Sequence, residues 1–231
     1  MERAKKSGFK VLVVTADVPM PSERERSKIA GAQVPLKFNL KFVFNVLLKP
    51  VWLLSTLIRG VPRLRTVHKY TNNNSLKFVS GFVGNRLGGS LDWVYCKELI
   101  EAWNGPTIIK GILSEKDLEK AIEVGFDGVY VSNHGGRQFD GGKSSIESLK
   151  LISKANKGRV KLIFDSGVRS GLDIMRALHC GADFVMLGRP FMYGVAADFK
   201  EGPKKVFEIL KKGLINNMSQ IGVKNIEDFK I

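Results

Sequence analysis

"SNHGGRQFDGG" (residues 132–142) continues the apolar run "DGVYVS" (127–132), which has the length and β-branched composition of a buried strand. A histidine, two glycines and an arginine therefore lie where this strand ends. His134 can accept a proton near neutral pH, and Arg137 can hold a carboxylate through two parallel hydrogen bonds. The two glycines between them let the backbone pass close to a ligand. This stretch predicts a ligand-binding loop at the carboxyl end of a strand.

Similar runs recur along the chain. Each is short, rich in β-branched residues and apolar at successive positions, which is typical of parallel strands buried on both faces. Amphipathic segments with helix-capping residues separate the runs, so strand and helix alternate and right-handed βαβ crossovers are expected. The predicted strands are "KVLVVT" (10–15), "PTIIK" (106–110), "GVYVS" (128–132), "VKLIF" (160–164) and "DFVMLG" (183–188), and the predicted helices are "LDWVYCKELIEAW" (91–103), "SEKDLEKAIEVG" (114–125), "SSIESLKLISKAN" (144–156) and "SGLDIMRALHCG" (170–181).

Polar residues follow the end of each predicted strand. This repetition favours a TIM, or (β/α)₈, barrel, whose functional residues gather at the carboxyl ends of the strands. The residues are Asp17, Lys110, His134, Asp165 and the pair Gly188–Arg189. We expect an α/β fold that is a partial TIM (β/α)₈ barrel, with about five of the eight βα units. A doubly wound open sheet is the alternative. It would more often carry a GxGxxG or P-loop motif after its first strand, and neither occurs.

Two of these strand ends have the composition of a phosphate site. "DSGVRSG" (165–171) supplies Arg169 and two glycines, and "LGRP" (187–190) supplies Arg189 and a glycine. In barrels, the loops after the last two strands often hold a phosphate on backbone N–H groups and a helix start. The two motifs together predict phosphate binding, although each alone is a weak signal.

Composition and charge indicate a globular protein with an anionic partner. The chain has 231 residues, 44% of them hydrophobic, and carries a net charge of +15. Cys96 and Cys180 lie far apart and show no metal-ligand spacing, which indicates buried thiols in a reducing cytoplasm. The first residues show no signal-peptide h-region or cleavage site, so export is not expected. Between Arg26 and Leu91 there are eleven Lys or Arg and no Asp or Glu, a block that indicates an anionic partner.

Five motifs, taken in order, resemble those of one enzyme family. They are "AKKSGFKVLVVTADVPMPSERE" (4–25), "TIIKGIL" (107–113), "SNHGGRQFDGG", "DSGVRSGLDIMRAL" (165–178) and "LGRPFMYG" (187–194). The chain is similar to the FMN-dependent L-2-hydroxy acid dehydrogenases and oxidases. The "KPVW" and "RGVPR" motifs of the long insert are most similar to the L-lactate and mandelate dehydrogenase branch. Relative to that family, the chain starts at the helix before the fourth barrel strand, so only the carboxy-terminal part is matched.

The resemblance implies roles for individual residues. His134 would remove a proton from the substrate, Asp17 would orient His134, and Lys110 would stabilise reduced FMN. Arg137 and Arg24 would hold the substrate carboxylate, although the neighbouring Ser22 and Glu23 depart from the family's Gly-Arg-Arg-Glu. Asp17 as a strand-end turn residue and Arg24 as a solvated charge are the alternatives. The expected FMN contacts are Thr15, Lys110, Ser132, Asp165, Gly167, Arg169, Gly188 and Arg189.

The resemblance also implies an activity. We expect FMN-dependent oxidation of a small L-2-hydroxy acid, with L-lactate giving pyruvate. The alternative is a catalytically silent fragment or a split-gene subunit that needs the missing first three βα units from a complementing chain or a homo-oligomer. A third alternative, another FMN barrel such as an isopentenyl diphosphate isomerase, does not explain a histidine and arginine suited to a carboxylate substrate.

Residues 1–231 are expected to form a single domain that contains a membrane-facing insert, residues 27–90. Its stretch "FNLKFVFNVLLKPVWLLSTLI" (38–58) is interrupted by lysines and by Pro50, which argues against a membrane span. Two interfacial helices that break at Pro50, with Trp52 at headgroup depth, fit better; a helical lid over the active site is the alternative. The resemblance implies a cytoplasmic protein, peripheral on the inner face of the membrane, that passes electrons to quinone. No motif supports nucleic-acid binding.

Overall fold

The computed structural model describes residues 1–20, 29, 40–61, 65–68, 70–71, 75, 78–79, 81–83, 91–139 and 141–229. The chain divides into two compact units. We call residues 1–17 and 91–231 the sheet unit and residues 18–90 the inserted unit. Each unit is described by itself.

The sheet unit contains five parallel strands whose order in space is their order in the chain. They are β1 (Leu12–Thr15), β2 (Thr107–Ile112), β3 (Gly128–Val131), β4 (Lys161–Phe164) and β5 (Phe184–Val185). All five predicted strands are confirmed. A doubly wound sheet reverses its strand order part-way across. The described sheet has no such reversal, so the order is that of a barrel wall.

The strand register separates the two faces of the sheet. Thr15 pairs with Lys110, Lys110 with Tyr130, Tyr130 with Ile163, and Ile163 with Phe184, so these five side chains share one face, which we call the inner face. The alternate residues, including Val14, Ile109, Val129 and Leu162, are buried on the outer face. One irregularity interrupts the register in β2, between Lys110 and Ile112.

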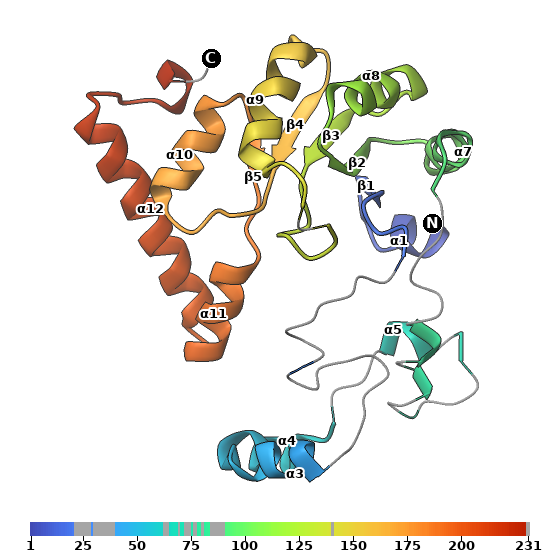
Figure 1. Cartoon of the computed structure of the whole chain (residues 1–231), viewed down its shortest axis with the longest axis vertical. Coiled ribbons are helices and arrows are strands. Elements are labelled where there is room, and N and C mark those ends of the chain that lie inside the picture. The colour runs from blue at the N-terminus through green and yellow to red at the C-terminus, as the bar shows by residue number, and fades with distance from the viewer. Residues whose placement is uncertain are drawn as a thin grey trace. The chain divides into compact units, whose positions relative to one another are not determined.

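Helices cover the outer face. In Figure 1, α7 (Trp93–Trp103), α8 (Glu115–Val124), α9 (Ser145–Asn156) and α10 (Gly171–His179) follow one another around the outside of the sheet. Buried side chains join each helix to the strands in one core, among them Cys96 of α7, Leu118 and Ala121 of α8, Leu149 and Ile152 of α9, and Ala177 of α10. The four predicted helices are confirmed.

Capping residues fix where these helices begin. Ser144 and Glu147 form a reciprocal capping box at the start of α9, and Ser170 and Asp173 form another at the start of α10. The Ser114 side chain accepts a hydrogen bond from the Asp117 N–H at the start of α8. The unit also contains α1 (Glu2–Lys6), α11 (Arg189–Ala197), α12 (Gly202–Gln220) and a 3₁₀ helix, η1 (Ile226–Phe229).

Part of the inner face is open to solvent in the described chain. Val13 of β1 is 45% exposed and Phe184 of β5 is 60% exposed. No described strand pairs with the outer edge of β1 or of β5. Cys96 and Cys180 are free thiols; Cys96 is buried, as predicted, whereas Cys180 is only partly buried.

The described part of the inserted unit includes three helices. It contains α3 (Leu40–Leu47), α4 (Pro50–Arg59) and α5 (Arg65–His68). Pro50 is the first residue of α4, which confirms the predicted break there. Among the described residues, no helix combines the length and the apolar character that a membrane crossing requires. Arg24, expected to contact substrate, lies outside the described residues.

Candidate active site

The carboxyl ends of the strands bring the predicted site residues to one end of the sheet. Asp17 follows β1, His134 follows β3, Asp165 follows β4, and Arg189 begins the helix after β5. Lys110 was expected just past the end of its strand. The structure instead places it inside β2, because β2 continues through an extra residue, Gly111, to Ile112. The contacts described below join several of these side chains.

His134 and Asp17 form a pair. The His134 Nδ1 atom lies 3.0 Å from the Asp17 Oδ1 atom, although the two residues are 117 positions apart in the chain. The loop holds His134 at a left-handed φ of +57°, and its N–H donates to the Ser132 hydroxyl at 3.1 Å. When Nδ1 carries the proton and donates to Asp17, Nε2 is left as the acceptor. The pair therefore has the geometry of a histidine base with an orienting carboxylate.

Lys110 lies beside this pair and is held by three neighbours. Its Nζ donates to the Ser132 hydroxyl at 2.8 Å and forms an ion pair with the Asp165 carboxylate at 3.6 Å. It also lies 4.9 Å from the centre of the Tyr130 ring. Ser132 is fully buried, so the contacts of its hydroxyl are with Lys110 and with the His134 backbone rather than with a ligand.

Two site residues were missed by sequence reasoning. The Tyr130 hydroxyl donates to the Asp165 carboxylate at 2.9 Å, and the Ser166 hydroxyl donates to it at 2.7 Å. Ser166 also accepts the Gly135 N–H at 3.0 Å, which ties the β4 loop to the histidine loop. Burial, followed by the charge of Asp165 and its hydrogen bond, raises the pKa of Tyr130 well above its usual range, so the phenol stays a donor.

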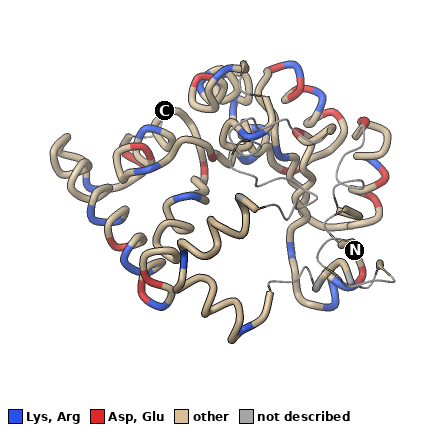
Figure 2. The backbone as a smooth tube through the Cα atoms, turned by 60° about the horizontal axis from the view of Figure 1, so that its bottom comes forward, with Lys and Arg blue, Asp and Glu red and all other residues tan. Residues whose placement is uncertain are grey.

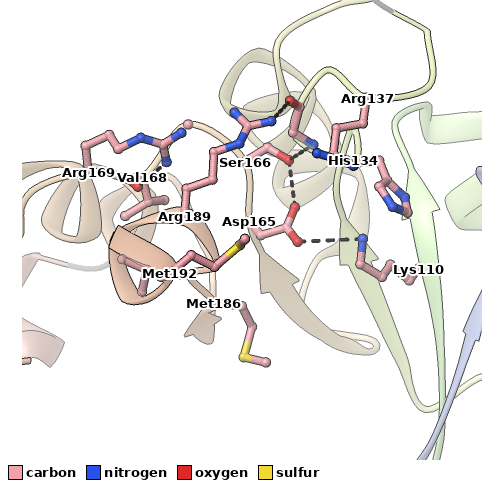
Figure 3. A pocket seen from close by; sticks show the side chains of 14 residues that line it. Lys110, His134, Arg137, Asp165, Ser166, Val168, Arg169, Met186, Arg189 and Met192 are labelled. Carbon is pink, nitrogen blue, oxygen red and sulfur yellow. Dashed lines mark hydrogen bonds and ion pairs between the residues drawn. The ribbon is translucent and has the colours of Figure 1, made fainter. Parts of the chain in front are cut away.

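The predicted phosphate residues line a cavity of about 360 Å³ next to these groups. Figure 3 shows Arg169 and Arg189 at one side of it and Lys110 and His134 at the other. The Arg189 Nη2 atom donates to the Gly135 carbonyl at 2.6 Å, and the Arg169 Nη1 atom donates to the Val168 carbonyl at 2.7 Å. Arg137 borders the same cavity. Three arginine residues therefore line one cavity.

Glycines open the wall of this cavity. A Cβ atom built on Gly167 or on Gly188 would meet nothing within 4 Å, and Gly167 has a φ of +87°. A ligand can therefore approach the backbone at both positions. Met186, Leu187 and Met192 supply an apolar part of the lining.

Three predicted site residues, Thr15, Asp17 and Ser132, do not line this cavity. Thr15 ends β1 and is aligned with Lys110, but it is exposed and does not line the cavity. Asp17 does not line it either and reaches the site through its contact with His134. In the described chain, no group of three or more His, Cys, Asp or Glu residues is placed to hold a metal ion.

Comparison with known proteins matches the chain to one enzyme family. The family model for FMN-dependent dehydrogenases matches residues 1–230. An L-lactate dehydrogenase of Pseudomonas entomophila (strain L48) is 40% identical over 230 residues, which are 99% of this chain and 60% of that protein. One from Vibrio cholerae serotype O1 (strain M66-2) is 37% identical over 99% of this chain and 61% of its own length.

Solved structures give the same result. The monotopic membrane protein (S)-mandelate dehydrogenase superposes with a TM-score of 0.91 at 33% identity, covering 99% of this chain and 61% of its own. A putative lactate oxidase of Pediococcus acidilactici superposes with a TM-score of 0.77 at 33% identity, covering 99% of this chain and 54% of its own. The chain thus spans about three fifths of the length of these relatives.

Proposed function

Because this chain belongs to the FMN-dependent dehydrogenase family, we propose that it oxidises an L-2-hydroxy acid, with L-lactate as substrate and pyruvate as product. The observation that carries the proposal is the His134–Asp17 pair, 3.0 Å apart, next to a cavity with arginines at one side and Lys110 at the other. The L-lactate dehydrogenases among its relatives support the choice of substrate.

The cavity has the chemistry that FMN requires. FMN carries a phosphate at one end and a largely apolar ring at the other. Arg169 and Arg189 supply the charged donors that bind a phosphate best, and Gly167 and Gly188 leave backbone accessible beside them. Met186 and Met192 offer an apolar surface to a ring. Bound FMN would supply an acceptor for the two electrons that leave the substrate.

The residues of the chain would divide the remaining work. Arg137 would hold the substrate carboxylate through paired hydrogen bonds, and the family resemblance adds Arg24 to this role. His134 would take a proton from the substrate on Nε2, since Nδ1 faces Asp17. Asp17 would stabilise the positive charge that His134 gains.

Lys110 would stabilise negative charge at the cofactor. Its ammonium group lines the cavity, and Ser132 and Asp165 fix its position before any reaction begins. Such a preorganised charge stabilises an anion without a cost of reorganisation at the moment of reaction.

The inserted unit is proposed to lie on the inner face of the membrane, with quinone as the electron acceptor. Leu40, Val51 and Ile58 of α3 and α4 are 89%, 78% and 82% exposed. Residues 18–90 hold 12 of the 37 Lys and Arg but only 2 of the 22 Asp and Glu, whereas elsewhere both signs are interspersed along the helices (Figure 2). Apolar surface with basic charge is the composition of an interfacial segment. The monotopic mandelate dehydrogenase supports this assignment.

The proposed function is tested with purified chain, FMN and L-lactate. We expect flavin fluorescence to report FMN binding in the parent chain and in the variant His134→Gln, because His134 is not among the expected phosphate ligands. We expect Arg169→Ala to weaken FMN binding by about 10-fold or more, since it removes a charge-assisted contact. Equal FMN affinity in the Arg169→Ala variant and the parent would contradict the cofactor site.

The catalytic assignment is tested by anaerobic reduction of bound FMN by L-lactate, with a chain that carries the first three βα units of a family member added wherever the parent alone does not turn over. His134→Gln should be slower by about 10² to 10⁴-fold, the usual contribution of a general base. Reduction at the parental rate by His134→Gln would remove His134 from the mechanism.

A further inference from the structure

Gly111 is the extra residue that interrupts β2. Lys110 pairs with Tyr130 and Ile112 pairs with Val131, so one extra residue of β2, Gly111, lies between two positions whose partners are adjacent in β3. This is a β-bulge, and Gly111 adopts a φ of +102°, a conformation that L residues rarely take. The bulge keeps Lys110 on the inner face and still buries Ile112 on the outer face.

Asp17 packs directly on the bare Cα of Gly111. A Cβ atom at position 111 would lie 2.5 Å from the Asp17 Cβ, 2.7 Å from its Cγ and 3.0 Å from its backbone N. These atoms are at the base of the side chain, so a rotamer change cannot remove them from contact. Any side chain at position 111 must displace Asp17.

Hydrogen bonds alone do not explain how Asp17 is held. Its Oδ1 lies 3.0 Å from His134, whereas its Oδ2 is buried and has no hydrogen-bond partner among the described residues. A carboxylate with one hydrogen bond can turn about that contact. Packing against Gly111 supplies the second constraint.

We propose that Gly111 is a positioning residue for the proposed reaction, because its missing side chain makes the space in which Asp17 orients His134. The inference rests on the proposed role of His134 as the base. The bulge then contributes to the position of two charged groups. Lys110 immediately precedes it, and Asp17 packs against it.

The chain contains a matched control for the test. Gly125 has a φ of +104°, nearly that of Gly111, but a Cβ atom there would meet nothing within 4 Å. Gly111→Ala and Gly125→Ala therefore introduce similar backbone strain, and only Gly111→Ala introduces the collision with Asp17. A difference between the two variants isolates the collision.

The first measurement is the protonation pattern of the neutral His134 ring, read from ¹⁵N chemical shifts of the full chain without FMN or substrate. The chain has three histidines, and His134→Gln identifies the relevant signal. We expect the proton on Nδ1 in the parent and in Gly125→Ala, and loss of that preference in Gly111→Ala. An unchanged pattern in Gly111→Ala, or the same change in Gly125→Ala, would overturn the proposal.

A second background covers the case in which Gly111→Ala does not fold. Asp17→Gly removes both side-chain atoms of the collision and leaves only the backbone N, at 3.0 Å. The denaturation midpoint of Gly111→Ala should therefore recover when it is combined with Asp17→Gly, a non-additive result expected of residues in contact. If the double variant fails to fold while Gly125→Ala folds, the bulge itself needs glycine and the link to Asp17 is wrong.

Catalysis gives a third measurement that separates the two proposals. In a chain that oxidises L-lactate, Gly111→Ala should lower kcat by about 10²-fold with little change in KM, since a misplacement of about 1 Å has that effect. An unchanged kcat would overturn the positioning role. If the ¹⁵N pattern changes but the parent shows no turnover even when a chain with the first three βα units of a family member is added, the proposed function is contradicted and the role of Gly111 stands.

Discussion

Tyr130 lies between Val129 and Val131, and this apolar setting conceals a polar role. Its ring forms part of the inner face beneath Lys110, at 4.9 Å, while its hydroxyl reaches the Asp165 carboxylate at 2.9 Å. Asp165 is thereby drawn toward Lys110, Tyr130 and Ser166. Asp165, which the sequence predicts as a cofactor contact, therefore also holds Lys110 in position.

The variant Tyr130→Phe should lower the free energy of unfolding by about 1 kcal/mol, because it removes one donor from a charged acceptor and keeps the ring. The loss should be the same at neutral and mildly alkaline pH, since the raised pKa of Tyr130 keeps the phenol protonated in both. Urea unfolding measures it. Tyr95→Phe is the control, because Tyr95 is 50% exposed and its hydroxyl has no hydrogen bond among the described residues. Equal effects of the two variants would contradict the Asp165 contact.

At the residue scale, the sequence predicts groups with distinctive chemistry and misses those that support them. His134, Lys110 and Arg189 stand out because a charge or a base after an apolar run is unusual. Tyr130 and Ser166 do not stand out, because an aromatic residue is common in a strand and a serine is common in a turn. Their role depends on which residue lies opposite in the neighbouring strand or loop. Strand alternation could have placed Tyr130 on the face of Lys110, had the register been known.

Among the elements, helices α7 to α10 were predictable because their signals are local. A capping serine followed three residues later by an acid marks the starts of α8, α9 and α10 in the sequence itself. The bulge in β2 was not predictable. Its cause is the fit between β2, β3 and Asp17, and these are brought together only by the fold.

The helices α3 and α4 should bind anionic vesicles through exposed apolar side chains. We expect the double variant Leu40→Glu/Ile58→Glu to lose co-sedimentation with phosphatidylserine vesicles, because it places two charges on surface that would enter the interface. Raised salt should weaken binding of the parent, since basic residues contribute. Deleting residues 36–66 should have the same effect as the double variant.

The matched control adds the same charge to exposed apolar surface of the sheet unit. Phe199 and Ile209 are 75% and 69% exposed, and these fractions are comparable to the 89% of Leu40 and the 82% of Ile58. Phe199→Glu/Ile209→Glu should therefore leave vesicle binding unchanged. Loss of binding in both double variants would show that net charge, rather than the inserted unit, decides the interaction.

For the whole molecule, the solvent-exposed part of the inner face bears on whether the chain can turn over substrate. Val13 and Phe184 are about half exposed although they are apolar and belong to the side of the sheet that a barrel encloses. The cavity that would hold FMN phosphate is formed within the described chain, whereas the inner face beside β1 and β5 has no cover there. FMN binding can use the cavity that is already formed, whereas turnover also requires precise positions for the groups on the uncovered inner face.

We expect the isolated chain to bind FMN weakly and to show no appreciable turnover of L-lactate. Activity should return when a chain that carries the first three βα units of a family member is added. The physical reason is precision: a displacement of about 1 Å at the reacting atoms can lower the rate by about 10²-fold. The measurement is anaerobic reduction of FMN with and without the added chain. A family-like rate from this chain alone would contradict the prediction.

The position of the inserted unit has a consequence for the order of folding. Paired residues lie 20 positions apart across β2–β3, 33 across β3–β4 and 21 across β4–β5, but Thr15 and Lys110 lie 95 apart because residues 18–90 intervene. Closing the longest loop costs about 1.4 kcal/mol more in chain entropy than closing the shortest, at about 0.6 kcal/mol per doubling.

We therefore expect β2 to β5 to form first and β1 to join them last. Pulse-labelling hydrogen exchange during refolding should protect the amides of Ile109, Val129 and Leu162 before that of Val14. Simultaneous protection of all four would contradict this order. Since Asp17 follows β1, the carboxylate proposed to orient His134 would take its place after the rest of the site is built, and a refolding chain would position the proposed base before its partner.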